Sequence, residues 1–422
     1  INMKKDVIVI GGGIIGMSCA VELATRGAQV TVIEKGKVGM GCSYGNAGWM
    51  TPCFAMPLPM PGMLMKSMKW MLDPEGPLYI KPSLNWKLAQ WLLLFLKNMN
   101  QQQCHQAIEG LVELSKLSLN KYEALAQEYP QIDFHKKGLL MASQTPDGLQ
   151  AAIDELNLVS QFAVPGRAMN ADEIKQFEPA LQGPILGGVY FPNEAHAEPL
   201  AVVTSLQEKA LKLGVRILEN TEVLQFQIEN NKLQRLKIHS HTQNTDLTDH
   251  MAAEKYVMAT GSWSADLAKQ LRLNVPILGG KGYAMIVPPL TSQPTYPLML
   301  VEKKIAITPR ANSLRIAGTL ELVDQDFSIT ERRVRAIEKG ARQFLKLPPH
   351  LDIQETWNGL RPCTPDGVPL IGPTKKADNL VLACGHQMLG LQSGYGTGVL
   401  VSDLVMTGSS QWNRKIFNPD RF

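Results

Sequence analysis

The sequence predicts a mixed α/β fold that opens with a Rossmann-like, dinucleotide-binding unit and contains a second, mixed sheet. A strand–helix–strand pattern with a glycine-rich turn at its first junction occupies residues 4–34. Residues 281–320 alternate in hydrophobicity and contain several prolines, which favours strands of a mixed sheet. Residues 380–406 again show a strand, a glycine-rich turn and a helix.

The composition is that of a folded protein with a large core. Hydrophobic residues make up 45% of the 422 residues and charged residues 19%. This length predicts two or three domain-sized units. The formal net charge of +4 gives no reason to expect a nucleic-acid partner.

The six cysteines show no C-x-x-C pair and no zinc-like spacing with histidine, so we expect reduced thiols and no metal site. No run of eighteen apolar residues is present, and the chain enters a strand almost at once. These features favour a cytoplasmic protein without a transmembrane helix.

The N-terminal elements follow from hydrophobic periodicity. Residues 4–10 predict a buried parallel strand, residues 14–26 a helix that ends at Gly27, and residues 29–34 a second strand. Residues 39–62 predict a long, ordered loop, and mostly helical patterns follow in residues 63–125.

The rest of the chain predicts further strands and helices. A helix is expected at 198–213, where Pro199 lies near its start and Gly214 just past its end. A second helix, rich in charged residues, is expected at 328–346. The remaining predicted elements are strands at 132–142, 185–191 and 215–218, a β-meander over 222–260, and the final strand, turn and helix from 380 to 406.

The glycine-rich turn GGGIIG at 11–16 predicts a dinucleotide site. Gly11 permits the tight turn, Gly13 lets the backbone approach a pyrophosphate, and Gly16 lets the helix pack close to the sheet. Backbone N–H groups and the helix dipole face the phosphates. Glu34 ends the second strand, where its carboxylate can accept hydrogen bonds from ribose hydroxyls and would repel a 2′-phosphate.

Three glycine-rich segments favour FAD as the dinucleotide. The segment 39–48 (GMGCSYGNAG) can lie along an extended cofactor, the turn 259–264 (ATGSWS) can approach its adenine half, and the helix after Gly385 can stabilise charge on a reduced flavin. The expected cofactor-binding residues are Gly11, Gly13, Ile14, Ile15, Gly16, Glu34, Lys35, Cys42, Ser43, Asn46, Ala47, Gly48, Val223, Thr260, Gly261, Trp263, Gly385, Gly390, Leu391 and Gln392.

These motifs together resemble the D-amino acid oxidase superfamily of flavoproteins, and within it the bacterial D-amino acid dehydrogenases. Glycine oxidases and sarcosine oxidases are more distantly similar. Besides the βαβ unit, the resemblance depends on GCSYGNAG at 41–48, AHAEP at 195–199, WNGLRPCTPDG at 357–367 and the glycine-rich C-terminus, in this order along nearly the whole chain.

The resemblance implies a discontinuous FAD domain interleaved with a substrate domain. We assign 1–50, 195–280 and 352–422 to the first, and 51–194 and 281–351 to the second, with a helical insertion at about 50–100. The implied reaction oxidises an amino acid to an imino acid, which water hydrolyses to a 2-oxo acid and ammonia. In the dehydrogenases, the electrons pass to a quinone or another respiratory carrier.

The chain departs from related families at two positions. Glycine oxidase-like proteins carry a second arginine after the Gly-His pair near the C-terminus, where this chain has Gln387 and Met388. Covalently flavinylated sarcosine oxidases use a cysteine where Gly359 falls in this chain. We therefore expect non-covalent FAD and only one cationic clamp for the substrate carboxylate.

Arg361 is the first candidate for that clamp, because a planar guanidinium binds a carboxylate bidentately and the family motif places an arginine there. Arg310 is a weaker alternative, and Tyr283 could add a hydroxyl to the carboxylate. His386 is expected near the flavin, where proton chemistry and a packing role are equally open. A deprotonated substrate amine would make a general base unnecessary.

Residues 50–97 combine seven methionines, two downstream tryptophans and five lysines with only two acidic residues. This composition suits either peripheral contact with the inner face of the cell membrane or a lid packed on the substrate domain. The membrane alternative fits a dehydrogenase that feeds a quinone.

Two other functions remain open at this level. One is an oxygen-using oxidase of glycine, sarcosine or a secondary amine such as hydroxyproline, which stoichiometric peroxide would reveal. The other is a flavin-bearing subunit of a larger complex without independent activity, which flavin bleaching by a D-amino acid alone would exclude.

Overall fold

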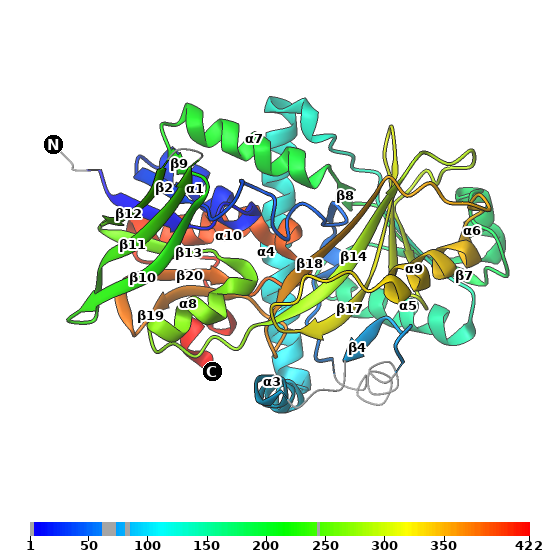
Figure 1. Cartoon of the computed structure of the whole chain (residues 1–422). Coiled ribbons are helices and arrows are strands. Elements are labelled where there is room, and N and C mark those ends of the chain that lie inside the picture. The colour runs from blue at the N-terminus through cyan, green and yellow to red at the C-terminus, as the bar shows by residue number, and fades with distance from the viewer. Residues whose placement is uncertain (1–3, 61–72, 81–84, 243–244) are drawn as a thin grey trace.

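The computed structural model describes residues 4–60, 73–80, 85–242 and 245–422. Its two large sheets lie side by side, and a long helix, α4 (Gln101–Glu128), runs between them (Figure 1). The mixed α/β class predicted from the sequence is confirmed.

The first sheet is six-stranded and parallel, except that its edge strand β19 is antiparallel to β20. This is the expected Rossmann-like arrangement, because the first βαβ unit, β1–α1–β2, supplies its centre. In spatial order its strands are β19 (Leu370–Thr374), β20 (Ala377–Cys384), β13 (Lys255–Met258), β1 (Asp6–Ile10), β2 (Gln29–Ile33) and β9 (Arg216–Leu218).

Both faces of this sheet are covered, which explains the continuous apolar run of β1. Val7 and Val9 belong to the core formed with α1 (Ile14–Thr25), α7 (Pro199–Lys212) and α10 (Gly390–Thr407). Ile8 and Ile10 pack into a second core beneath the β-meander. The meander consists of β10 (Thr221–Glu229), β11 (Lys232–Thr242) and β12 (Thr245–Met251), as the sequence predicts.

The second sheet is mixed, as expected. β5 pairs in parallel with β15, β4 (Leu78–Ile80) pairs in parallel with β17, and the other strand pairs are antiparallel. The strands of its main path are β18 (Glu355–Cys363), β14 (Leu278–Val287), β17 (Leu314–Val323), β16 (Ile305–Pro309), β15 (Leu298–Leu300), β5 (Leu139–Ser143), β7 (Gly187–Phe191) and β6 (Arg167–Asn170).

Shorter elements complete the fold. The helix α9 (Glu331–Phe344) packs its buried face on β14, β16 and β17. The remaining helices and strands of the described residues are α3 (Trp86–Lys97), α5 (Pro146–Ser160), α6 (Ala171–Phe177), α8 (Ser264–Gln270), β3 (Trp49–Met50) and β8 (Ala195–His196), with short 3-10 turns at Pro52–Phe54, Pro130–Ile132, Gly261–Trp263, Lys415–Phe417 and Pro419–Arg421.

Two features differ from the expected division of the chain. β18 lies in a segment assigned to the cofactor domain, yet it pairs with β14 at the edge of the second sheet. α4 lies in a segment assigned to the substrate domain, yet it packs on α10 of the first sheet, where the Tyr122 hydroxyl donates to Leu391 O (2.8 Å) and Ser118 Oγ accepts from Gly396 N (2.8 Å). The two sheets are therefore joined through α4 as well as through the chain crossings.

The segment 50–97 is described in part, because 61–72 and 81–84 lie outside the described residues. Where mostly helices were expected, Leu78–Ile80 instead adds the strand β4 to the second sheet. In α3, Trp91 is buried and its Nε1 donates to Cys363 O (3.0 Å), whereas Trp86 and Leu93 are 72% and 65% exposed. No helix among the described residues is long and apolar enough to cross a membrane.

Candidate functional site: a dinucleotide cavity beside an unpaired arginine

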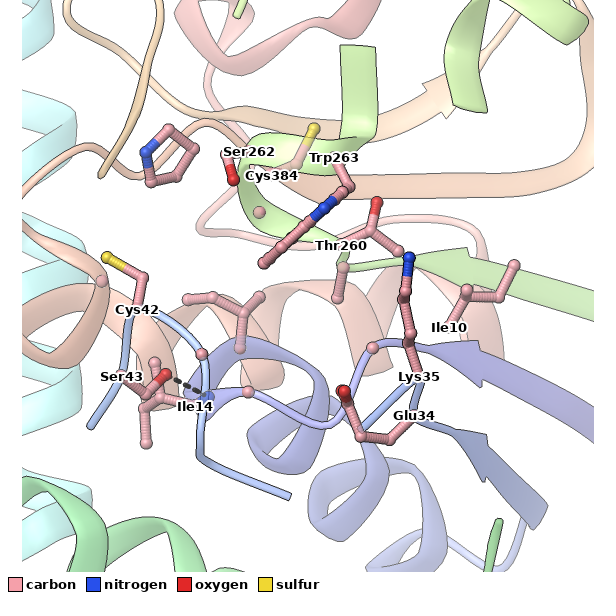
Figure 2. Close-up of a pocket in the computed structure, with 18 of the residues that line it drawn as sticks. Ile10, Ile14, Glu34, Lys35, Cys42, Ser43, Thr260, Ser262, Trp263 and Cys384 are labelled. Carbon is pink, nitrogen blue, oxygen red and sulfur yellow. Dashed lines mark hydrogen bonds between the residues drawn. The ribbon is translucent and has the colours of Figure 1, made fainter. Parts of the chain in front are cut away.

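A cavity of about 600 Å³ opens where β1, β2, β13 and β20 end. Figure 2 shows its centre: Ile14 at the start of α1 lies below it, Glu34 and Lys35 lie on one side, Cys42 on the other, and Trp263 above. Most of the expected cofactor-binding residues line this cavity. These are Gly11, Gly13, Ile14, Ile15, Glu34, Lys35, Cys42, Ser43, Asn46, Val223, Thr260, Gly261, Trp263, Gly390 and Leu391.

The glycine-rich turn has no room for side chains. A Cβ at Gly11, whose φ is +105°, would lie 2.4 Å from Ala259 O, and one at Gly16 would lie 1.8 Å from Gly11 O. The turn can therefore bring α1 against β1 with its first N–H groups directed at the cavity. Ser43 lies beside the start of α1, where its Oγ accepts a hydrogen bond from Ile14 N (3.0 Å; Figure 2).

The Glu34 carboxylate forms one end of the cavity. It accepts hydrogen bonds from Gly12 N (2.6 Å) and Gly36 N (2.8 Å), which hold it beside the glycine-rich turn. Next to it, Lys35 Nζ pairs with Glu222 Oε1 (2.8 Å) at the surface. A carboxylate held in this way at the end of β2 has the geometry that binds ribose hydroxyls.

The opposite end of the cavity lies at the start of α10. It is lined by Cys42, Pro362, His386, Gln387 and Gly390. Burial raises the pKa of the Cys42 thiol to about 11 and lowers the pKa of His386 to about 3. Both side chains are therefore neutral near pH 7, and the His386 Nε2 forms a 3.0 Å hydrogen bond with Thr397 Oγ1.

Five expected cofactor residues lie behind the cavity wall. Gly16 packs under the turn, a Cβ at Gly48 would meet Ala197 O at 2.3 Å, and one at Gly385 would meet Thr364. Ala47 O accepts from Thr308 Oγ1 (2.8 Å). The Gln392 amide is bound to Thr51 and Ser115, so the structure gives it a role in packing α10 on α4.

The second sheet holds the loop 44–48 against the cavity. Arg315 Nη1 donates to Tyr44 O (3.1 Å) and to Asn46 O (2.8 Å). Arg310 forms an ion pair with Glu198, which also lies 3.8 Å from Arg315 Nη2. Two guanidinium groups and one carboxylate thus lie together behind the loop, and of the three residues Arg315 is fully buried.

This pairing argues against Arg310 as the substrate anchor. Burial and the neighbouring Arg315 lower the pKa of Arg310 to about 9, so it remains charged near pH 7. Its charge is already compensated by Glu198. We assign it to the support of the loop.

Arg361 has a different environment. Its Nη1 donates to Thr319 O (2.7 Å), and the guanidinium lies over Gly282, where a Cβ would be 2.2 Å from Nη1. Burial lowers the pKa of Arg361, and the nearby Cys42 and Cys363 side chains oppose this shift. Within the described residues, no carboxylate pairs with it. Because arginine stays protonated, this partly buried cation is open to an anionic ligand.

Tyr283 lies on the wrong face of the sheet for its expected role. It is 0% exposed and belongs to the core between the second sheet and α9, where its hydroxyl accepts a hydrogen bond from Thr330 N (3.2 Å). Gly282, next to it, faces Arg361 instead. Opposite Gly282, β17 carries an extra residue, because Lys281 pairs with Glu321 and Tyr283 pairs with Gly318. The structure therefore argues against Tyr283 as a carboxylate ligand.

Two residues near Arg361 were not singled out from the sequence. The Trp357 indole covers Gly45 and Gly359, where a Cβ would lie 1.9 Å and 2.1 Å from its ring. Gln387 lines the cavity with a left-handed φ of +52°. The two glycines were a signal for Trp357, whereas the sequence marked Gln387 only as part of the pair that replaces the second arginine of glycine oxidase-like proteins.

The cavity at the end of the parallel sheet can hold a dinucleotide, and an arginine without a carboxylate partner lies on the adjoining sheet. This combination is typical of a redox enzyme that holds an extended cofactor next to an anionic substrate. The chain belongs to the FAD dependent oxidoreductase family, whose sequence pattern matches residues 6–404. The glycine positions that exclude a Cβ and the ribose-type carboxylate are consistent with FAD as its cofactor.

Relatives share nearly the full length of the chain. It is 30% identical over 415 residues to a D-amino acid dehydrogenase from Helicobacter pylori, covering 98% of both chains. It is 31% identical over 417 residues to a D-amino acid dehydrogenase from Vibrio atlanticus, covering 96% and 97%. A glycine oxidase from Bacillus cereus has the same fold, with a TM-score of 0.75, 22% identity and 96% coverage of both chains.

Proposed function

We propose that this protein is a D-amino acid dehydrogenase. It oxidises the bond between Cα and nitrogen of a small D-amino acid, and water hydrolyses the resulting imino acid to a 2-oxo acid and ammonia. The observation that carries the proposal is the partly buried Arg361 guanidinium, which no described carboxylate neutralises and which precedes the cavity-lining Pro362. The relatives named D-amino acid dehydrogenase support the substrate class.

Arg361 binds the substrate carboxylate and so orients the Cα–H bond. Its planar fork suits a carboxylate, and the hydrogen bond to Thr319 O keeps one nitrogen in place. Gly282 leaves the space that the guanidinium occupies. Bound FAD supplies the acceptor for the hydride that leaves Cα.

Proton transfer needs no protein base in this proposal. His386 has a pKa of about 3 because of burial, so it is too weak a base to take a proton from an ammonium group. The substrate therefore reacts as its free amine, and the rate of flavin reduction is expected to rise with pH as more substrate amine is deprotonated.

FAD is held without a covalent bond in this proposal. Cys42 and Cys384 both line the cavity, and burial raises their pKa values to about 11 and about 12. Protonated thiols are poor nucleophiles, so neither is suited to attack the flavin ring. Acid precipitation of the protein should leave all of the FAD in the supernatant.

The electrons pass to a quinone or another respiratory carrier at the membrane. The exposed face of α3 supports a peripheral contact, because Trp86, Leu93 and Leu96 present apolar side chains to solvent while Lys97 ends the helix. Vesicles with anionic lipids should float the wild-type protein. A Trp86→Ser/Leu93→Ser variant should stay in the soluble fraction, whereas Leu211→Ser, which changes an exposed leucine on α7, should float normally.

An anaerobic substrate screen tests the reaction. Purified protein with bound FAD is mixed with D-, L- and N-methyl amino acids, and flavin bleaching is recorded. The proposal requires bleaching by small D-amino acids and dye or quinone reduction without stoichiometric peroxide. Bleaching by glycine or sarcosine alone, with peroxide formed in air, would identify an oxidase instead.

Arg361 variants test the anchor. Arg361→Ala is expected to raise the substrate KM by at least about tenfold, because at least one charge-assisted hydrogen bond to the substrate is lost. FAD should remain bound. Arg361→Lys should recover only part of the affinity, because an ammonium group lacks the planar fork. Unchanged KM values for every substrate would remove Arg361 from this role.

A further inference from the structure

We propose that the side-chain amide of Gln387 contacts the pyrimidine ring of bound FAD and raises the reduction potential of the flavin. This inference rests on FAD binding in the cavity, as the proposed function requires, but not on the identity of the substrate. It is carried by three observations: the position of Gln387 in the cavity wall, the strained backbone of this residue, and a buried amide that has no partner.

The position of Gln387 assigns it to the flavin end of the cavity. Glu34 marks the ribose end, and Gln387 lies at the other end, three residues before α10 begins at Gly390. Pro362, which follows the proposed substrate anchor, lines the cavity beside it. An extended dinucleotide with its ribose at Glu34 therefore directs its redox ring toward Gln387.

The backbone of Gln387 is held in an unfavourable conformation. Its φ of +52° lies in the left-handed region, which residues with a Cβ rarely adopt. The N–H group donates to Pro362 O (3.1 Å), and His386 next to it pairs with Cys363 across a β-bridge. Such strain persists where the surrounding structure enforces it, and it is frequent at functional sites.

Gln387 is 5% exposed, yet its buried amide nitrogen, Nε2, has no hydrogen-bond partner among the described residues. A buried amide without a partner costs about 1–3 kcal/mol. The nearby Gln392 shows the contrast, because both ends of its amide are bound to Thr51 and Ser115. The partner that Gln387 lacks is thus expected from the molecule that fills the cavity.

The chemistry of the pyrimidine ring matches a primary amide. Its edge carries one N–H donor and two carbonyl acceptors, and a glutamine amide offers both a donor and an acceptor, which exchange when the amide is turned by 180°. On reduction this ring gains negative charge. A donated hydrogen bond stabilises the charged form more than the neutral one, so it raises the potential.

Three variants separate the amide from the backbone. Gln387→Met keeps the length of the side chain and removes the amide. Gln387→Gly removes the amide and also relieves the left-handed strain. Gln387→Asn keeps an amide on a residue that tolerates positive φ. FAD affinity and unfolding temperature are measured first, so that each variant is known to be folded and loaded.

The readout is the midpoint potential of the bound flavin, measured by reductive titration against a reference dye without any amino acid. Met and Gly variants are expected to shift the equilibrium toward oxidised flavin about tenfold, which corresponds to about 30 mV for a two-electron couple. The Asn variant is expected to lie closer to wild type than either.

Unchanged potentials in the Met and Gly variants would overturn the inference, and so would an Asn variant that behaves like Met. A change confined to substrate KM would assign the amide to the substrate instead, which also overturns it. Failure of the wild-type protein to reduce with any amino acid would count against the proposed function alone, because the potential is measured without substrate.

Discussion

The guanidinium of Arg361 lies directly over the backbone of Gly282, so that a Cβ at position 282 would be 2.2 Å from Nη1. The two residues come from neighbouring strands, where Gly282 is the direct partner of Gly359. The absence of a side chain at 282 thus creates the space in which the cation lies unpaired. If Arg361 binds the substrate carboxylate, as we propose, Gly282 is a determinant of that binding.

Gly282→Ala is therefore expected to displace Arg361 and to raise the substrate KM about tenfold or more, because small displacements of a positioning group have large effects on rate. FAD binding should be unaffected. Steady-state kinetics with a small D-amino acid provide the measurement. Gly318→Ala is the matched control, because its Cβ points to the other face of the sheet, 3.2 Å from Ile305 Cγ1. Equal KM effects in both variants would contradict the prediction.

Glu34→Gln is expected to weaken FAD binding by about ten- to a hundredfold, because charge-assisted hydrogen bonds contribute about 1.5–3 kcal/mol each. The carboxylate would lose its charge both toward ribose hydroxyls and toward Gly12 N and Gly36 N. Fluorescence titration of apoprotein with FAD measures the change. Glu208→Gln, an exposed site on α7, should leave the dissociation constant at its wild-type value.

Arg315→Met is expected to loosen the loop 44–48. Tyr44 O and Asn46 O would lose their donor, and the loss of two such hydrogen bonds predicts a destabilisation of about 2–4 kcal/mol. Urea unfolding and the rate of FAD release both report it. Arg335→Met, which breaks an exposed pair with Glu331, should cost less than about 0.5 kcal/mol. Similar losses in the two variants would show that the loop contacts are not the cause.

The pH dependence of stability should change when Glu194 is replaced by glutamine. Burial raises the pKa of this carboxyl group to about 8 in the folded protein, against an ordinary value of 4.5. Between these values the unfolded chain releases the proton and the folded protein keeps it, so the free energy of unfolding of the wild type falls as pH rises.

Glu194→Gln lacks this titration. Its stability relative to wild type is therefore expected to increase from pH 5 to pH 8, by at least about 1 kcal/mol, since one pKa unit corresponds to 1.36 kcal/mol. Urea unfolding of both proteins at the two pH values measures the difference, in which all other titrating groups cancel. A difference that stays constant with pH would contradict the raised pKa.

The cofactor cradle could be predicted because its determinants are local. Gly11, Gly13, Gly16 and Glu34 act within one βαβ unit, and the spacing of these residues already contains the geometry. The βαβ unit, the meander and the mixed sheet were predicted from periodicity for the same reason.

The surroundings of the arginines depend on contacts that the sequence does not reveal. Arg310 is compensated by Glu198, more than a hundred residues earlier in the chain. Tyr283 lies in the core beneath α9, while its neighbour Gly282 faces Arg361. The left-handed conformation of Gln387 carries no sequence signal, because such positions are normally recognised by glycine.

The strand β18 connects the proposed substrate anchor to the wall of the cavity. Arg361 and Pro362 are consecutive residues of this strand, and Pro362 both lines the cavity and accepts the hydrogen bond from Gln387 N. The proposed substrate anchor and the wall of the cavity thus share one stretch of backbone. A relative motion of the two sheets is therefore expected to leave the spacing between them unchanged.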